Sequence, residues 1–189
     1  MRKVVASEFV SLDGVMEAPD KWHFPYFNDE MGEVIGEGFA ASDAMLMGRV
    51  NYEEWAEYWP KQDPEENPVA AVMNDFRKYV VSTTLEEPLE WSNSTLIKGN
   101  VAEEIEKLKN QPGMDIAISG SATLVRSLLR YGLLDELKLM VHPILVGGGK
   151  RLFDEKAETK PLELVNSKTF STGVLYLTYR PVGTRKGAR

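Results

Sequence analysis

Three loops of small or charged residues follow apolar stretches of this 189-residue sequence, and each could bind phosphate. The first loop, Ser-Gly-Ser at residues 119–121, joins an apolar run to a segment whose leucines recur at helical spacing. The first N–H groups of a helix have no intrahelical acceptor and lie at the positive end of its dipole. Gly120 permits close backbone approach, and Ser121 can cap the helix or bond a phosphate oxygen. The loop therefore predicts a phosphate site, or else an ordinary turn between strand and helix, where serine and glycine are also common.

Two other loops repeat this arrangement. Residues 147–149 are three glycines after an apolar run, and Gly48-Arg49 stands between an apolar run and a helical segment. Arginine offers a planar, charged fork that suits a phosphate group, although a flexible turn and a surface arginine are the simpler alternatives. At the ends of successive strands, the three loops together predict one crevice for an extended anionic ligand. The sequence contains neither G-x-x-x-x-G-K-[ST] nor G-x-G-x-x-G, so the usual phosphate and dinucleotide motifs are absent.

Hydrophobic periodicity predicts the elements that must position these loops. Strands are expected within residues 1–10, 44–47, 78–82, 115–119, 136–146, 162–170 and 174–180. Helices are expected at 31–41, 51–59, 101–110 and after residue 121. The alternation predicts an α/β fold with three layers, α/β/α, around a mixed, mostly parallel central sheet.

The organisation of the chain is expected to be simple. We predict one domain over residues 1–183, followed by a flexible basic tail at 184–189. Residues 15–30 hold two prolines and four aromatic side chains and are predicted to form a long loop, and residues 62–68 a polar loop.

Composition and charge exclude several classes of function. There are 29 acidic and 22 basic side chains, so a general attraction to nucleic acid or to an anionic membrane is not expected. No cysteine is present, which excludes disulfides and thiolate chemistry, and no apolar stretch is long enough to span a membrane. His23 and His142 are too few and too far apart in sequence to predict a metal site. We expect a cytoplasmic protein without metal.

Several segments resemble the dihydrofolate reductase-like family. These are MGRVNYEEW (47–55), VVSTTL (80–85) and SGSATLVRSLL (119–129). Within that family, SLDGVM, GSATL and LLDELKLMVHPILVGGGKRLF, in this order, most resemble the C-terminal reductase domain of the bifunctional riboflavin-pathway deaminase-reductase. The resemblance covers roughly residues 2–180. It implies a dihydrofolate reductase-like fold, NADPH as cofactor and a homodimer.

The resemblance also implies which positions contact the cofactor. Gly48 and Arg49 would lie near the phosphates, residues 82–83 near the 2′-phosphate, residues 120–123 at the pyrophosphate and residues 146–148 beside the nicotinamide. The cofactor-binding residues expected in this way are Gly48, Arg49, Ser82, Thr83, Gly120, Ser121, Ala122, Thr123, Val146, Gly147 and Gly148. Asn51 stands where the family motif more often has threonine.

The predicted substrate pocket combines the end of the first strand with the aromatic loop. Its expected residues are Leu12, Asp13, Trp22, Phe24 and Phe27. Aromatic side chains could stack on a planar heterocycle, although they more often fill a core or a dimer contact. Asp13 is the candidate catalytic residue, because it would abut the crevice, and capping of the turn is its alternative role.

The resemblance implies hydride transfer from NADPH to a planar nitrogen heterocycle, such as 5-amino-6-(5-phosphoribosylamino)uracil. In dihydrofolate reductases, a buried carboxylate lies two residues after the proline of a Trp-x-x-Pro segment. Here that position is Phe27, and Asp29 cannot replace it on a helix, because two residues turn the side chain by about 200°. This departure counts against pterin reduction of the dihydrofolate reductase type, which is one alternative function. It favours the other alternative, a non-catalytic, homodimeric nucleotide-binding protein.

Overall fold

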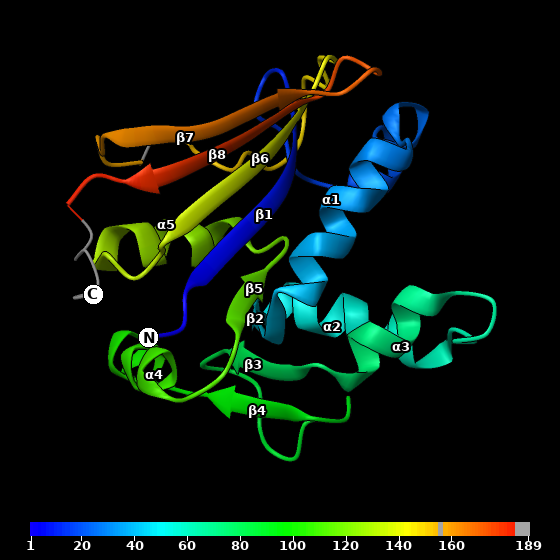
Figure 1. The fold of residues 1–189 in the computed structure, drawn as a ribbon. Coiled ribbons are helices and arrows are strands. Elements are labelled where there is room, and N and C mark those ends of the chain that lie inside the picture. The colour runs from blue at the N-terminus through cyan, green and yellow to red at the C-terminus, as the bar shows by residue number, and fades with distance from the viewer. Residues whose placement is uncertain (155–156, 184–189) are drawn as a thin grey trace.

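A computed structural model describes residues 1–154 and 157–183, so the predicted basic tail at 184–189 lies outside the described residues. Eight strands form one sheet in the order β4-β3-β2-β5-β1-β6-β8-β7 (Figure 1). Neighbours among β1 to β6 pair in parallel, whereas β8 pairs antiparallel with β6 and β7. The strands are β1 Val4–Ser11, β2 Ser42–Gly48, β3 Arg77–Val81, β4 Ser94–Ile97, β5 Asp115–Ile118, β6 Glu136–His142, β7 Leu162–Thr169 and β8 Leu175–Pro181. The predicted mixed, mostly parallel sheet is confirmed.

Within the described residues, five α-helices cover the two faces of the sheet. They are α1 Asp29–Ala40, α2 Arg49–Tyr58, α3 Pro68–Asp75, α4 Val101–Asn110 and α5 Ala122–Tyr131. Side chains of a strand alternate between faces, and β2 shows the result. Ala44 and Leu46 pack in the core beneath α4 and α5, whereas Met45 and Met47 pack with Tyr52 of α2 on the opposite face. The predicted three layers follow from this alternation.

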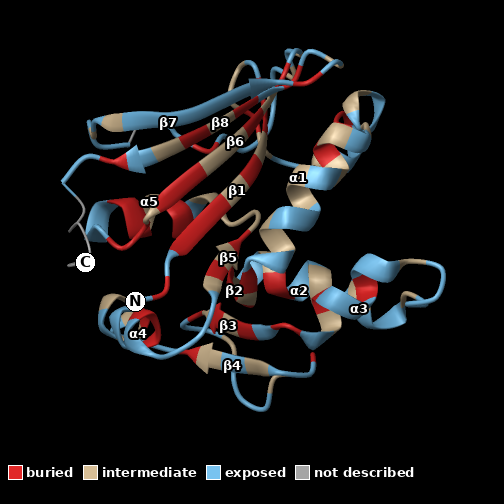
Figure 2. Cartoon of the chain, in the orientation of Figure 1, coloured by how far each residue is buried: buried red, intermediate tan, exposed pale blue. Residues whose placement is uncertain are grey.

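Burial is concentrated in the middle of the sheet. Figure 2 shows buried residues along β1, β5 and β6, whereas β7 is exposed over nearly its whole length. The fully apolar side of α5 explains its position, because Leu124, Val125, Leu128 and Leu129 are all buried. In the described part of the chain, none of the helices combines the length and apolar character that a membrane crossing requires.

The sequence-based prediction missed two short elements and extended a third. Helix α3 begins at Pro68, the last residue of the predicted polar loop, and proline is well suited to a first helical turn. Strand β4 has only four residues and was not predicted. Strand β6 ends at His142 rather than at residue 146, because Pro143 has no N–H to continue the ladder. The aromatic loop at 15–30 contains two short 3-10 helices, Pro19–Lys21 and Phe24–Tyr26.

Candidate cofactor cradle and adjoining cavity

The loops that follow β2 and β5 are bonded to each other. Both strands end at the same edge of the parallel sheet, so the residues that follow them are neighbours in space. The Gly48 N–H donates to Ser121 Oγ at 3.0 Å, and Asn51 Nδ2 donates to the Ser119 carbonyl oxygen at 3.0 Å. The structure thus brings together two of the three loops that the sequence singled out.

The turn into α5 has an unusual backbone. Gly120 and Ser121 are both left-handed, with φ of 78° and 61°. Ser121 is the residue before the helix, yet its side chain makes no capping bond. The first N–H groups of α5 therefore have no acceptor from the helix or from this hydroxyl. A Cβ at Gly120 would lie 2.7 Å from Asn51 Oδ1, so the chain keeps this position free of a side chain. We call this turn, residues 119–121, the cradle, because open N–H groups at a helix start can bind an anion.

The segment predicted to bind the 2′-phosphate follows β3. Ser82 is buried, and its Oγ accepts the N–H groups of Thr84 and Leu85, both at 3.1 Å. Thr83 is exposed. Arg49 is also on the surface, where its guanidinium donates to Glu53 at 2.7 Å one turn along α2. Exposed pairs of this kind contribute little free energy and are readily exchanged for another anion.

Asp13 anchors the glycine loop. Its carboxylate accepts the Ser11 hydroxyl at 2.5 Å and the N–H groups of Val146 and Gly147 at 3.1 and 2.8 Å. The Ser11 hydroxyl and these two N–H groups lower the pKa of Asp13 to about 2. Because the carboxylate is already bonded by the protein, the geometry favours a positioning role over proton transfer. Gly148 follows directly in the same loop, where its N–H donates to the Val146 carbonyl oxygen.

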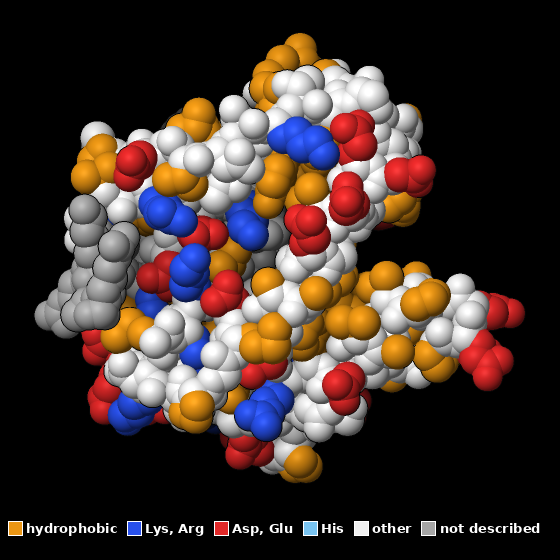
Figure 3. Space-filling model, viewed as in Figure 1, with side chains coloured by type: hydrophobic (Ala, Val, Ile, Leu, Met, Phe, Trp, Pro, Cys, Tyr) orange, Lys and Arg blue, Asp and Glu red, His pale blue; other side chains and the backbone are white. Residues whose placement is uncertain are grey.

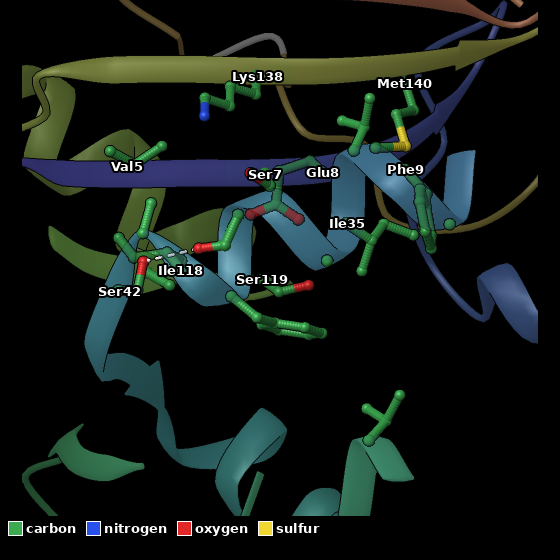
Figure 4. A pocket seen from close by; sticks show the side chains of 18 of the residues that line it. Val5, Ser7, Glu8, Phe9, Ile35, Ser42, Ile118, Ser119, Lys138 and Met140 are labelled. Atoms are coloured by element: carbon green, nitrogen blue, oxygen red, sulfur yellow. Dashed lines mark hydrogen bonds between the residues drawn. The ribbon is translucent and has the colours of Figure 1, made fainter. Parts of the chain in front are cut away.

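A cavity of about 480 Å³ lies beside the cradle, between α1 and the sheet (Figure 4). Phe24 and Phe27 of the predicted substrate pocket line it, whereas Leu12, Asp13 and Trp22 do not. Trp22 instead packs against His142 at 5.1 Å between ring centroids. Other lining side chains include Phe9, His23, Ile35, Phe39, Val69 and Met140. Figure 3 shows hydrophobic side chains gathered where α1 meets α2 and α3, along this cavity.

Two features of the cavity were missed from the sequence. The glycines of α1 line it, and a Cβ at Gly36 or Gly38 would meet nothing within 4 Å, so these residues leave the cavity open. Glu8 lies on β1 and is buried, with Oε2 accepting the Gly120 N–H at 2.8 Å. Burial raises the pKa of Glu8 well above its usual range, although this bond lowers it. The sequence did contain a signal for Glu8, because it is the one charged residue of β1, whose other residues are apolar or serine.

The two histidines lie in an aromatic cluster with Phe9 and Trp22. The Nδ1 atom of His142 is 2.9 Å from the Met140 carbonyl oxygen, and the rings of His23 and His142 are perpendicular at 6.1 Å. Burial lowers the pKa of both residues, which favours the neutral imidazole. Among residues 1–154 and 157–183, no three potential metal ligands gather in one place.

The chain is similar to known proteins in sequence and in fold. Residues 2–176 match the family described as the RibD C-terminal domain. The chain is 33% identical to the uncharacterised protein YyaP of Bacillus subtilis (strain 168) over 181 residues, which cover 94% of each chain. A putative riboflavin biosynthesis protein from Shewanella sp. PV-4 superimposes with a TM-score of 0.74 at 22% identity, covering 95% of this chain and 98% of that one.

A more distant solved structure shows the same fold. Dihydrofolate reductase from Enterococcus faecalis, complexed with NADP(H) and RAB-propyl, has a TM-score of 0.63 at 12% identity. The alignment covers 95% of this chain and 96% of that one. The fold is therefore dihydrofolate reductase-like, as the sequence motifs implied.

Proposed function

Because the chain belongs to the RibD C-terminal domain family, we propose that it is an NADPH-dependent reductase that transfers a hydride to a planar nitrogen heterocycle. The observation that carries this proposal is the open turn at Gly120 and Ser121, bonded to Gly48 and placed beside an aromatic cavity. A dinucleotide needs such a phosphate cradle at one end and a pocket for a ring at the other.

The residues present fit the cofactor. We propose that the first turn of α5, with Ala122 and Thr123, and the start of α2 bind its phosphates through free N–H groups. Asp13 would hold the 146–148 loop in position beside the ring. When bound, NADPH supplies the hydride, and the protein aligns the two reacting rings and excludes water.

The substrate proposal rests on the walls of the cavity. Phe24, Phe27 and His23 line the cavity, and aromatic rings suit contact with a planar heterocycle. We propose a substrate of the 5-amino-6-(5-phosphoribosylamino)uracil type, which agrees with the riboflavin-related names of similar structures. Phe27 lines the cavity where a dihydrofolate reductase would place a carboxylate, and Asp29 is exposed, so pterin reduction is less well supported.

The proposal predicts a preference for NADPH that depends on Arg49. For this preference we propose that the exposed Arg49 guanidinium bonds the 2′-phosphate, which only NADPH carries. We expect Arg49→Ala to weaken NADPH binding by about 10-fold and NADH binding by less than about 3-fold, since a hydrogen bond to a charged group contributes about 1.5–3 kcal/mol. Calorimetric titration of both nucleotides into both proteins measures this. Arg130→Ala is the matched control, because Arg130 is an exposed arginine in the last turn of α5, at the end of that helix away from the cradle. If the wild-type protein binds neither nucleotide, the reductase proposal is wrong.

A nucleotide-binding protein without efficient catalysis is the second candidate. It is favoured by the aromatic residue, Phe27, in place of the expected carboxylate. The two proposals differ in turnover. A reductase should oxidise NADPH in the presence of at least one member of a panel of pterins, ribosylaminopyrimidines and small carbonyl compounds. Tight NADPH binding without turnover across the panel would favour the second candidate.

We also propose a homodimer formed through the β7 edge of the sheet. Strand β7 is exposed over seven of its eight residues. The exposed apolar side chains at this edge are Leu164 and Val165 of β7 and Leu175 of β8. An exposed edge strand with apolar side chains is suited to pair with another chain. Light scattering should therefore give twice the chain mass of 21.3 kDa. A mass of one chain at all concentrations would contradict the proposed dimer.

The cytoplasmic location of the protein stays a prediction.

A further inference from the structure

Glu8 lies where two central strands separate. Strands β1 and β5 pair only as far as Ala6 and Ile118. Two residues further along the chain from each of these, Glu8 Oε2 accepts the Gly120 N–H at 2.8 Å. The carboxyl group therefore occupies the place where the ladder would continue. In Figure 4 it projects from β1 toward Ser119, among the side chains that line the cavity.

The second oxygen of Glu8 lacks a partner. Oε1 is buried and makes no hydrogen bond within the described part of the chain. An unpaired polar atom in such a place costs free energy, and an unpaired buried charge costs much more. Burial therefore favours the neutral acid, in which Oε1 carries a proton that it cannot donate to the protein. A ligand acceptor beside Oε1 would satisfy this donor.

We propose that Glu8 recognises the amide edge of a bound ring, in which a carbonyl oxygen and an N–H lie side by side. A neutral acid matches this edge with two parallel hydrogen bonds. Oε1–H donates to the ligand carbonyl, and the second lone pair of Oε2 accepts the ligand N–H while the first keeps the Gly120 bond. The inference rests on the proposed function, because both the carboxamide of nicotinamide and the lactam of a pyrimidine or pterin present such an edge.

Substitutions at Glu8 test the inference by binding alone. We expect Glu8→Met, which keeps the length of the side chain but cannot form either bond, to weaken binding of the recognised ring by about 10-fold or more. Glu8→Gln can form both bonds and should stay within about 3-fold of the wild-type affinity. Melting temperatures of the three proteins control for folding. A Gln variant as weak as the Met variant would overturn the proposed pairing.

Two pairs of probes distinguish the source of the amide. If it belongs to the cofactor, Glu8→Met weakens NADPH but not 2′-phospho-ADP-ribose, which lacks the nicotinamide. If it belongs to the heterocycle, NADPH is unaffected, and Glu8→Met weakens the bicyclic lactam lumazine in the presence of NADP⁺. Unchanged NADPH affinity, together with unchanged or undetectable lumazine binding, would overturn the inference. In that case NADPH binding by the wild-type protein would still support the proposed function, which fails only if no nucleotide binds.

The pH dependence of binding supplies an independent readout. Affinity of the wild-type protein for the amide ligand should fall as the pH rises through the pKa of Glu8, because the carboxylate loses its donor. His23, Asp115, Lys138 and Tyr176 also line the cavity and carry titratable groups. Glu8→Gln retains all four, so its affinity should not show this fall. The same pH profile in both proteins would assign the titration to another group and count against Glu8.

Discussion

Gly120→Ala is expected to weaken NADPH binding by about 10-fold or more. A left-handed conformation costs a residue with a Cβ about 1–2 kcal/mol, and Gly120 has φ of 78°. The new Cβ would also lie 2.7 Å from Asn51 Oδ1, and Asn51 cannot move away without losing its bond to the Ser119 carbonyl. The turn would therefore change its backbone conformation, which would move its N–H groups away from the proposed phosphate position. Calorimetric titration with NADPH measures the loss.

The chain contains a matched control at the other end of the same helix. Gly132 ends α5, has φ of 69°, and a Cβ there would meet nothing within 4 Å. Gly132→Ala should lower the free energy of unfolding by about 1–2 kcal/mol, the same backbone strain as at Gly120, and should leave NADPH affinity unchanged. Equal losses of affinity in the two variants would show that general destabilisation, and not the cradle, caused the effect.

Lys78→Met is expected to lower the free energy of unfolding by about 2–4 kcal/mol. Lys78 is fully buried on β3, and its Nζ donates to the carbonyl oxygens of Asn74, Phe76 and Ser92 at 3.0, 2.7 and 3.1 Å. It also lies over the Trp91 ring, 4.4 Å from the centroid. Methionine fills much of the same volume but leaves the carbonyl oxygens of Phe76 and Ser92 without a side-chain donor, whereas the Asn74 carbonyl still accepts Asn93 Nδ2 at 3.2 Å. Each unpaired buried group costs about 1–3 kcal/mol unless water reaches it.

Urea denaturation of the two proteins measures this difference. Lys107→Met on α4 is the control, because Lys107 is exposed and its pairs with Glu103 and Glu104 lie on the surface. That variant should change the free energy of unfolding by less than about 1 kcal/mol. If Lys78→Met were as stable as the wild-type protein, the hydrogen bonds from the Lys78 ammonium group to the three carbonyl oxygens would not contribute to stability.

Local residue patterns were enough to predict the central elements and the turn of small residues that precedes α5. Gly120 and Ser121 were identified because a strand, a turn of small residues and an amphipathic helix follow each other directly in sequence. Short elements with weak periodicity, such as α3 and β4, were missed, since eight or four residues provide too little pattern. The end of β6 was misplaced by the apolar run that continues past Pro143.

The cavity was predicted less well than the cradle. Phe24 and Phe27 line it, as expected, but Trp22 faces His142 instead. Whether an aromatic side chain in a loop faces a pocket or a core depends on how that loop packs, which periodicity does not report. The glycines of α1 were read only as weak helix formers, yet they leave space above the sheet.

By itself, the sequence determined the layers of the sheet and the chemistry of its turns, because both depend on residues within a few positions of one another. Only the tertiary structure decided which turns meet and what faces the cavity. Glu8 and Gly120 are 112 positions apart and touch because β1 and β5 are neighbours that separate at that point. Burial of an acid depends on such distant contacts, so its unpaired oxygen could not be read from the sequence.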